Sequence, residues 1–273
     1  MIPKEILNRT GARNTASVPE NVLGLLNDGV IETVNLCEWL VVDQLALAEK
    51  IFPEHVWSRL LPGLRSDFRK LTPQTAPKKL ALVGKYLAAA FPQKSSALRS
   101  SQALLSSPSD IVRSWGAYLI GFSKTLSLPE KLTQIRPFAA DRNMSTREIA
   151  WLALRAEIPG NLEQALSLLS GFVTDPDPSI RRFASELTRP RGVWCSHIPA
   201  LKEYPEQGFE LLEPLRSDSS KYVRDSVGNW LNDASKSAPV SVKTLCDRWE
   251  KDSPSPETAY IVKRALRTLS KTS

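Results

Sequence analysis

The chain has 273 residues, of which 42% are hydrophobic, and a formal net charge of +7 at pH 7. No apolar run reaches the length of a membrane span, and no basic stretch followed by an apolar one opens the chain, so we expect neither membrane insertion nor export. Three scattered cysteines and two histidines fit no zinc motif and suit reduced thiols in a cytosol. A basic protein favours polyanions, usually nucleic acid, although a generally basic surface without such a partner is the alternative.

Helical patterns dominate the first half of the chain. Residues 1–18 lack apolar periodicity and are predicted to form a flexible arm, followed by a single repeat domain over 19–273. A long amphipathic helix is predicted over 33–51 and an apolar helix over 79–91. Asp28-Gly29 is predicted to turn the chain between two helices. Proline ends helices or opens them, so shorter helices are expected between Pro53, Pro62, Pro73, Pro77 and Pro92.

A short pattern repeats through the second half of the chain. An Asp or Ser stands five residues before an apolar-Arg pair or a Thr-Arg pair. The copies are Ser107 with Arg113, Asp141 with Arg147, Asp175 with Arg181, and Asp218 with Arg224. The residues before the first three arginines are 34 residues apart, and the last step is 43. A fixed period of this size is typical of stacked helical hairpins, and no strand alternation is sustained, so the sequence predicts an all-α helical-repeat solenoid.

Equivalent positions in stacked repeats lie along one surface, so the helices can be compared face by face. The residue after each recurring Arg begins a polar face with helical spacing. Three stripes result: Glu148, Trp151, Arg155; then Arg182, Glu186, Arg189; then Asp225, Asn229, Asn232, Asp233, with Lys236 one turn on. Arginines neutralise phosphates, and a carboxylate near a sugar can stabilise an oxocarbenium ion and orient water. Such a surface suits hydrolysis of an N-glycosidic bond to a cationic base. A row of this kind is more often a salt-bridged, solvated surface without a catalytic role.

Two longer segments resemble a known family. Residues 185–194, Ser-Glu-Leu-Thr-Arg-Pro-Arg-Gly-Val-Trp, and residues 218–236 resemble signatures of the AlkC branch of bacterial DNA alkylation-repair glycosylases. Residues 260–269 and 26–40 resemble further parts of that family. The family is related to AlkD, folds as HEAT-like repeats in an α-α superhelix, and releases 3-methylated bases from DNA. The resemblance therefore implies a monofunctional glycosylase acting on cationic bases of the 3-methyladenine and 3-methylcytosine type in duplex DNA.

The same resemblance implies roles for particular residues. Glu148 and Asp233 match the family's acidic positions and are expected to stabilise the sugar cation and hold water. Trp194 is expected to contact the lesion base or its deoxyribose, and Arg182 to bind a backbone phosphate. Three further DNA contacts are expected: Arg189, Arg191 and Lys236. No cofactor and no metal is implied, and the expected partner is double-stranded DNA carrying alkylated bases, bound by a cytoplasmic, nucleoid-associated monomer.

Some positions depart from the family or allow a structural explanation. Gly192-Val193 replaces the usual Leu-Pro before the tryptophan, and Glu130 is a second, poorer choice for the first carboxylate. Glu148 could belong to a capping box that begins at Ser145, since Ser-x-x-Glu fits that motif. Asp233 could pair simply with a lysine three residues on. The apolar spacing places two further tryptophans, Trp115 and Trp230, in the core, whereas Trp151 is ambiguous.

Two other functional classes remain open. A DNA-structure binder without chemistry would have the same basic helical surface. A protein-binding helical scaffold is also compatible with a 34-residue period, but the repeats lack the Trp-x-x-Leu-Gly and Ala-x-x-x-Phe pattern of tetratricopeptide arrays. We therefore rank the scaffold last.

Overall fold

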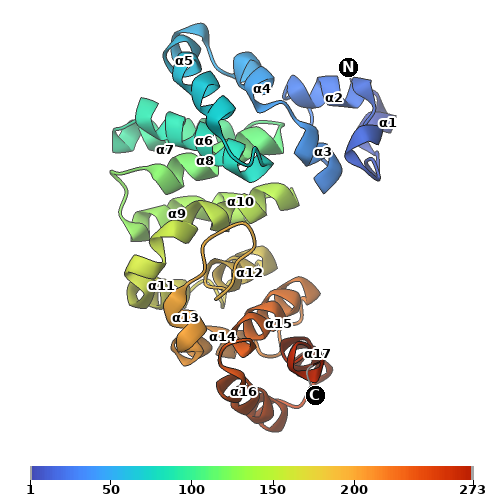
Figure 1. Cartoon of the computed structure of the whole chain (residues 1–273), viewed down its shortest axis with the longest axis vertical. Helices are drawn as coiled ribbons and strands as arrows, with labels where there is room; N and C mark the ends of the chain where they lie inside the picture. Colours follow the sequence, from blue (N-terminus) through green and yellow to red (C-terminus); the bar gives the residue numbers. More distant parts are fainter. Residues whose placement is uncertain (1, 272–273) are drawn as a thin grey trace. The chain divides into compact units, whose positions relative to one another are not determined.

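The computed structural model describes residues 2–271, apart from the side chains of residues 57, 59, 61, 62 and 271. Every regular element in this part of the chain is a helix (Figure 1), which confirms the predicted all-α, helical-repeat class. The chain divides into two compact units, Met1–Ala153 and Leu154–Ser273. Within the described residues, no helix is long and apolar enough to cross a membrane.

The first unit stacks its helices around an apolar core. Its elements are α1 (Lys4–Leu7), η1 (Thr15–Ser17), α2 (Glu20–Asn27), α3 (Leu36–Val41), α4 (Gln44–Ile51), α5 (Glu54–Lys70), α6 (Ala76–Ala90), α7 (Lys94–Leu105), α8 (Asp110–Phe122), α9 (Leu128–Ala139) and α10 (Met144–Leu154). Helix α8 packs against α6, α7 and α9 and is buried along nearly its whole length. Trp115, at its centre, is fully buried, as the apolar spacing predicted.

Close packing within this unit depends on small residues. A Cβ atom added at Gly84 of α6 would lie 2.2 Å from the Tyr118 Cβ on α8. A Cβ atom added at Gly121 of α8 would lie 2.2 Å from the Ala153 carbonyl oxygen on α10. Both distances are far inside van der Waals contact, so these glycines let α6, α8 and α10 approach one another.

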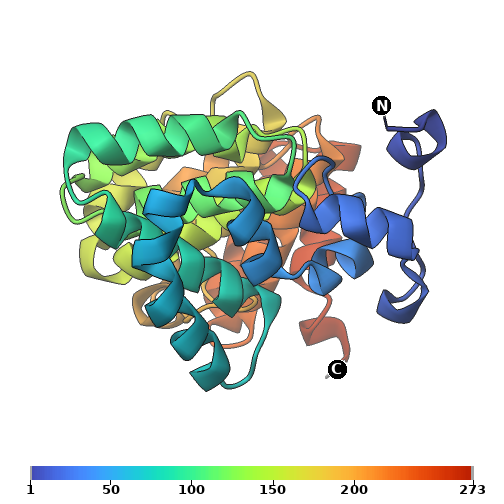
Figure 2. The same ribbon diagram turned by 90° about the horizontal axis from the view of Figure 1, so that it is seen from above.

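The N-terminal segment lies beside α2 and α3 in both views (Figures 1 and 2). Arg9 donates Nη2 to Glu38 Oε2 on α3 at 2.6 Å, and this glutamate is fully buried. Asn35 donates Nδ2 to the Ala12 carbonyl at 2.8 Å. The segment predicted as an arm is thus attached to α3 by an ion pair and a hydrogen bond, and its flexibility stays a prediction.

Two predictions about the first unit were wrong in detail. The helix predicted over 33–51 is two helices, α3 and α4, because Val42 is extended and Asp43 starts a new helix. The Asp43 carboxylate accepts the backbone N–H groups of Leu45 and Ala46, at 3.0 and 3.2 Å, and so caps α4. Pro62 was expected to separate helices but lies inside α5.

Two other local predictions are confirmed. The apolar helix predicted over 79–91 is α6, which begins slightly earlier with Pro77 in its first turn. The Asp28-Gly29 turn follows α2, and Gly29 has φ +71°, a conformation that glycine adopts without steric cost.

The second unit is also a stack of helices. Its elements are η2 (Arg155–Glu157), η3 (Pro159–Asn161), α11 (Leu162–Leu169), α12 (Pro178–Leu187), α13 (Pro199–Glu203), η4 (Pro205–Gly208), α14 (Phe209–Leu212), η5 (Glu213–Leu215), α15 (Lys221–Ser235), α16 (Pro239–Asp252), α17 (Pro256–Ala265) and η6 (Leu269–Lys271). Helix α15 packs against α12, α16 and α17. Its Trp230 is fully buried, which confirms its predicted core position, and donates Nε1 to Thr188 Oγ1 on the α12 side at 3.2 Å.

The recurring arginines join successive repeats. In the first unit, Arg113 donates Nε and Nη2 to the two carboxylate oxygens of Asp141, at 2.7 and 2.9 Å. In the second, Arg181 makes the same fork-to-carboxylate contact with Asp218, also at 2.7 and 2.9 Å. Each pair links the start of one repeat helix to the loop before the next. Such bidentate, charge-assisted bonds fix geometry as well as adding stability.

The same arginines also hold their own loops. Their Nη1 groups donate to the carbonyl six residues upstream, at 2.7 to 2.9 Å, in all four copies: Ser107 for Arg113, Asp141 for Arg147, Asp175 for Arg181, and Asp218 for Arg224. The aspartates in turn accept a backbone N–H two residues on, as Asp218 does from Ser220 at 2.8 Å. The arginine of each copy therefore holds the loop before its helix, and the Asp or Ser of each copy accepts a backbone N–H in that loop. Two of the arginines, Arg113 and Arg181, also join neighbouring hairpins. We call these contacts the Asp–Arg ladder.

Replacing Asp218 with Ala should lower the free energy of unfolding by about 2 to 3 kcal/mol, because Arg181 would lose its partner in a largely buried position. The control is Lys221→Ala, which removes an exposed partner of Asp225 and should cost less than about 1 kcal/mol. Urea unfolding of the whole chain measures both. Equal losses in the two variants would contradict the role of the ladder.

Candidate functional site

A buried carboxylate at the end of α15 is the centre of the site. Asp233 is 4% exposed, and its Oδ2 atom accepts Nη2 and Nε of Arg189, at 2.7 and 3.0 Å. Its Oδ1 atom accepts Nζ of Lys236, one turn on, at 3.3 Å. The pairing of Asp233 with Lys236 considered from the sequence is present, and the contact with Arg189 joins α15 to the end of α12.

Helix α12 contributes a row of alternating charges. Glu186, 2% exposed, lies between two arginines: Nη1 of Arg189 at 3.1 Å and Nη2 of Arg182 at 3.4 Å. The Arg182 guanidinium carbon also lies 4.2 Å above the Tyr222 ring, a cation–π contact. The stripe predicted as Arg182, Glu186 and Arg189 is therefore one ionic row, and it meets Asp233.

Burial and charge act against each other at Arg189. Burial lowers the pKa of this guanidinium, but the Glu186 and Asp233 carboxylates outweigh it, and the pKa is raised above its ordinary value. Arg189 therefore carries a permanent charge between two carboxylates. Both interactions use donors of Arg189, so it links the two carboxylates, and its expected contact with DNA stays a prediction.

The rest of the polar stripe on α15 faces another helix. Asp225 Oδ1 accepts the Tyr260 hydroxyl at 2.6 Å, and Asn229 Oδ1 accepts Nε of Arg264 at 3.1 Å. Both partners lie on α17. The predicted α15 stripe is thus divided, since Asp225 and Asn229 join α15 to α17, whereas Asp233 faces α12.

The loop between α12 and α13 is held by a buried arginine. Arg155, 2% exposed, donates Nη1 to the Leu187 carbonyl at 2.7 Å and Nε to the Ser196 carbonyl at 3.2 Å. Its Nη2 donates to the Arg189 carbonyl. Burial lowers the pKa of Arg155. Sequence reasoning placed Arg155 in a polar stripe but gave no sign of this role, because the acceptors are backbone carbonyls.

The apex of this loop presents an apolar pair to solvent. Trp194 is 60% exposed and has φ +64°, a left-handed conformation that costs a non-glycine residue roughly 1 to 3 kcal/mol. Val193 is exposed as well. Arg191, just before the apex, donates Nε to the Asp233 carbonyl at 3.1 Å. The loop is therefore anchored to the Asp233 region on one side, and its strained apex holds an exposed indole ring, in agreement with the prediction that Trp194 is not a core residue.

Two further groups border the loop. Burial raises the pKa of the Cys195 thiol, while the Arg155 and Arg189 charges oppose that rise. A Cβ atom at Gly192 would lie 2.2 Å from Cys195 Sγ, so a side chain at this position would displace the thiol. Burial, followed by nearby cations, lowers the pKa of His197, which favours the neutral imidazole at pH 7.

Glu148 lies in the first unit, on α10. Its Oε2 atom accepts Nε1 of Trp151 at 2.9 Å, and the tryptophan is buried. The capping-box explanation for Glu148 is wrong, because Asn143 caps α10 by accepting the Ser145 N–H at 2.9 Å. Glu148 is half-buried. The hydrogen bond from the Trp151 indole on the same helix orients its carboxylate.

Glu130, the second choice for the carboxylate, has a structural role. It accepts the backbone N–H and hydroxyl of Ser127, both at 2.9 Å, in a capping box at the start of α9. It also pairs with Lys94, and these contacts lower its pKa to about 2. The carboxylate is thus fully used at a helix start on the surface.

The helical repeats and the sequence signatures define a class: this chain has the fold of the AlkC and AlkD group. It is similar to the alkylpurine DNA glycosylase AlkC of Pseudomonas fluorescens, solved bound to DNA containing an abasic-site analogue, with 25% identity and a TM-score of 0.63 over 80% of this chain and 62% of that one. AlkD2 of Streptococcus mutans has the same fold, with 24% identity and a TM-score of 0.57 over 75% of this chain and 98% of that one. These likenesses confirm the family resemblance seen in the sequence.

A sequence relative is found as well. YhaZ of Bacillus subtilis (strain 168), an uncharacterized protein, is 41% identical over 109 residues, which are 40% of this chain and 30% of that protein. No family model matches the chain. The chain therefore spans less than two thirds of both AlkC and YhaZ.

Replacing Arg155 with Met should free the loop that carries Trp194, because three carbonyls lose a charged donor that methionine cannot supply. Hydrogen exchange over residues 188–198 should rise at least tenfold, with a loss of about 2 to 4 kcal/mol in unfolding free energy. Lys243→Met, at an exposed position on α16, should change neither. Unchanged exchange in Arg155→Met would contradict the positioning role.

Proposed function

We propose that the protein is a DNA repair glycosylase that hydrolyses the N-glycosidic bond of cationic alkylated bases, of the 3-methyladenine or 3-methylcytosine type, in duplex DNA. The single observation that carries this proposal is the buried Asp233 carboxylate, which Arg189 holds in place. It lies beside a loop that is anchored by hydrogen bonds and exposes Trp194, on a fold shared with AlkC. AlkC is an alkylpurine DNA glycosylase that binds DNA containing an abasic-site analogue. The net charge of +7 supports a nucleic-acid partner.

The leaving base in this reaction already carries a positive charge, so it needs little acid assistance. The barrier comes mainly from the positive charge that develops on the deoxyribose as the bond to the base breaks. A fixed carboxylate stabilises that charge and can orient the attacking water. Asp233 supplies such a carboxylate, and its cationic partners hold it still, so no reorganisation is needed during the reaction. Glu148 is proposed as the second carboxylate, oriented by the Trp151 indole.

The remaining residues have binding roles in this proposal. Trp194 would stack on, or pack beside, the lesion base or its sugar, for which an exposed indole in a fixed loop is suited. Arg182, Arg191 and Lys236 would face backbone phosphates. Arg189 orders Asp233 and Glu186, and its contribution to DNA binding is through them.

A second candidate is DNA binding without chemistry. It is favoured by one observation: Asp233 is paired with both Arg189 and Lys236, which reduces its capacity to stabilise a further positive charge. In this case the ionic cluster would act as a rigid surface that reads DNA shape.

The test is release of bases from methylated duplex DNA, identified by mass spectrometry. The wild-type chain should free 3-methylated bases, and Asp233→Asn should slow release by at least about 100-fold, the range for losing one preorganised electrostatic group. Glu148→Gln should also slow it. Asp225→Asn is the matched control, since it lies on the same helix but faces α17, and should keep near wild-type release.

The outcomes separate the candidates. Release at the wild-type rate by both Asp233→Asn and Glu148→Gln would refute the carboxylate roles. No release by any form, together with retained binding to a duplex with an abasic-site analogue, would favour the binder without chemistry.

A further inference from the structure

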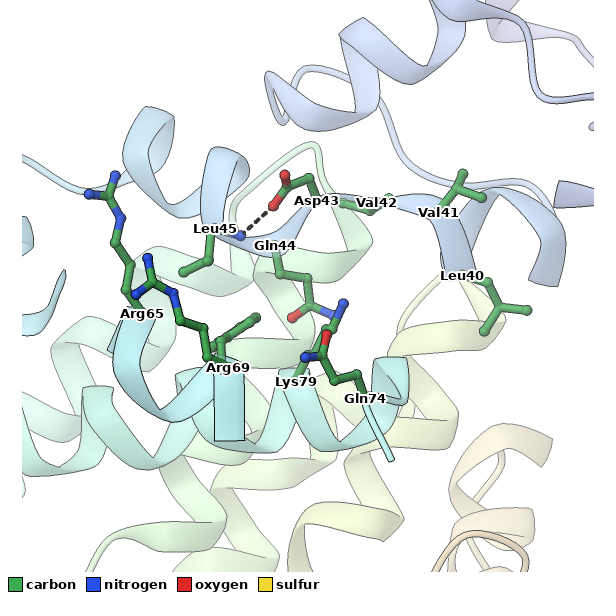
Figure 3. A pocket seen from close by; sticks show the side chains of 11 residues that line it. Leu40, Val41, Val42, Asp43, Gln44, Leu45, Arg65, Arg69, Gln74 and Lys79 are labelled. Carbon is green, nitrogen blue, oxygen red and sulfur yellow. Dashed lines mark hydrogen bonds between the residues drawn. The ribbon is translucent and has the colours of Figure 1, made fainter. Parts of the chain in front are cut away.

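A pocket with three cations in its lining opens in the first unit (Figure 3). Its volume is about 480 Å³, which is within the usual range for small-ligand sites. Its lining includes three apolar side chains, Leu40, Leu45 and Phe68. It also includes three cations, Arg65 and Arg69 from α5 and Lys79 from α6.

The carboxylates near this pocket leave two of the cations uncompensated. Glu49 pairs with Arg65. Asp43, in the pocket lining, keeps its charge and accepts two backbone N–H groups of α4 through Oδ1, but it forms no ion pair with Arg69 or Lys79 among the described residues. Among the residues that the structure describes, neither Arg69 nor Lys79 is paired with a carboxylate. The pocket therefore keeps net positive charge.

The Asp–Arg ladder explains why Lys79 is uncompensated. Lys79 lies 34 residues before Arg113, in the same register of the repeat, so it occupies the position of the ladder arginine. The partner of Arg113 is Asp141, 28 residues further on, and the corresponding residue for Lys79 is Ser107. The position that would hold an acidic partner for Lys79 is therefore occupied by a serine.

Ser107 makes the same hydrogen bond within its loop as the aspartates of the other repeats, but it carries no charge. Its Oγ atom accepts the Ser109 N–H at 3.2 Å, as Asp141 Oδ1 accepts the Asn143 N–H at 2.7 Å. The contact with the carbonyl six residues upstream is made here by the neighbouring residue, since Lys78 donates Nζ to the Thr72 carbonyl at 2.8 Å. The two tasks of the ladder arginine are thus divided: Lys78 holds the loop, and Lys79 lines the pocket.

One polar residue of the pocket lining, Gln44, is held in place by hydrogen bonds within the protein. Gln44 is buried, and its side-chain amide donates to the Ala76 carbonyl at 3.4 Å while it accepts Nε1 of Trp115 at 3.2 Å. Both ends of this amide are therefore occupied by the protein. A ligand would meet a fixed amide there, with polar recognition left to the cations.

We propose that this pocket binds the phosphate group of a nucleotide, with Arg69 and Lys79 on the phosphate and the base or sugar against Leu45 and Phe68. A guanidinium and an ammonium in one pocket suit phosphate oxygens, and the apolar side chains in the same lining suit a base. The nucleotide is either free or a unit of a DNA strand, since both present the same chemistry. This site is separate from the Asp233 cluster and does not depend on base release.

Isothermal titration calorimetry with thymidine monophosphate, oligothymidylate and inorganic phosphate tests the proposal. The double variant Arg69→Gln/Lys79→Gln should weaken nucleotide binding at least tenfold. The control Lys85→Gln/Arg99→Gln removes the same charge from exposed positions on α6 and α7 outside the pocket, and should bind within twofold of wild type. Inorganic phosphate should bind more weakly than the nucleotide, because it has no base or sugar to contact the apolar side chains of the pocket.

The source of the phosphate follows from which ligand responds. Loss of thymidine monophosphate binding in the double variant supports a free nucleotide. Loss confined to oligothymidylate supports a unit of a strand. Equal effects of the two double variants on every ligand would overturn the proposal. Methylated-base release by wild type is a separate readout, so failure here leaves the glycosylase proposal standing.

Discussion

The contact on which both units depend is the bidentate pair between a repeat arginine and the aspartate of the following repeat. Arg113 with Asp141 and Arg181 with Asp218 have the same two distances, 2.7 and 2.9 Å. A planar guanidinium meeting a carboxylate by two parallel bonds fixes both distance and rotation. The same arginine also holds its own loop, and the same aspartate accepts a backbone N–H in the loop before its helix, so these pairs fix how successive hairpins are aligned.

This constraint also positions the candidate site. Since Arg181 fixes the start of α12 against the loop before α15, the far ends of these helices meet in a defined register. There the ionic row of Arg182, Glu186 and Arg189 reaches Asp233. The stacking contacts and the Asp233 cluster thus lie at opposite ends of the same pair of helices. A rigid cluster of this kind stabilises developing charge without reorganisation, which is why the proposed chemistry needs the ladder.

Much of this could be predicted from the sequence, for identifiable reasons. The 34-residue period gave the helical hairpins, and helical phasing placed Arg182, Glu186 and Arg189 together because i+3 and i+4 spacing needs no tertiary information. The exposure of Trp194 followed from its place in a loop with proline and glycine. The break between α3 and α4 was missed because apolar spacing continues across it, while the Asp43 cap that interrupts the helix is a local backbone event.

Other features depend on tertiary contacts that leave no pattern. Arg155 and Asp225 both lie in predicted stripes, but one turns to loop carbonyls and the other to α17. Lys79 could not be predicted as a binding residue, because the position that would hold its acidic partner is a serine. The Asp–Arg pattern therefore does not mark this repeat in the sequence. The family resemblance gave Glu148 and Asp233 as a pair of carboxylates. The proposed role of each is supported by contacts within its own unit, with Trp151 for Glu148 and with Arg189 for Asp233.

The most direct measurement of the central claim is an experimental structure of the chain bound to a duplex that contains an abasic-site analogue. The account predicts the abasic sugar beside the Asp233 carboxylate, with the Trp194 ring against it and Arg182 at a phosphate. DNA bound elsewhere on the second unit, along α16 for example, with the Asp233 cluster facing solvent, would contradict it.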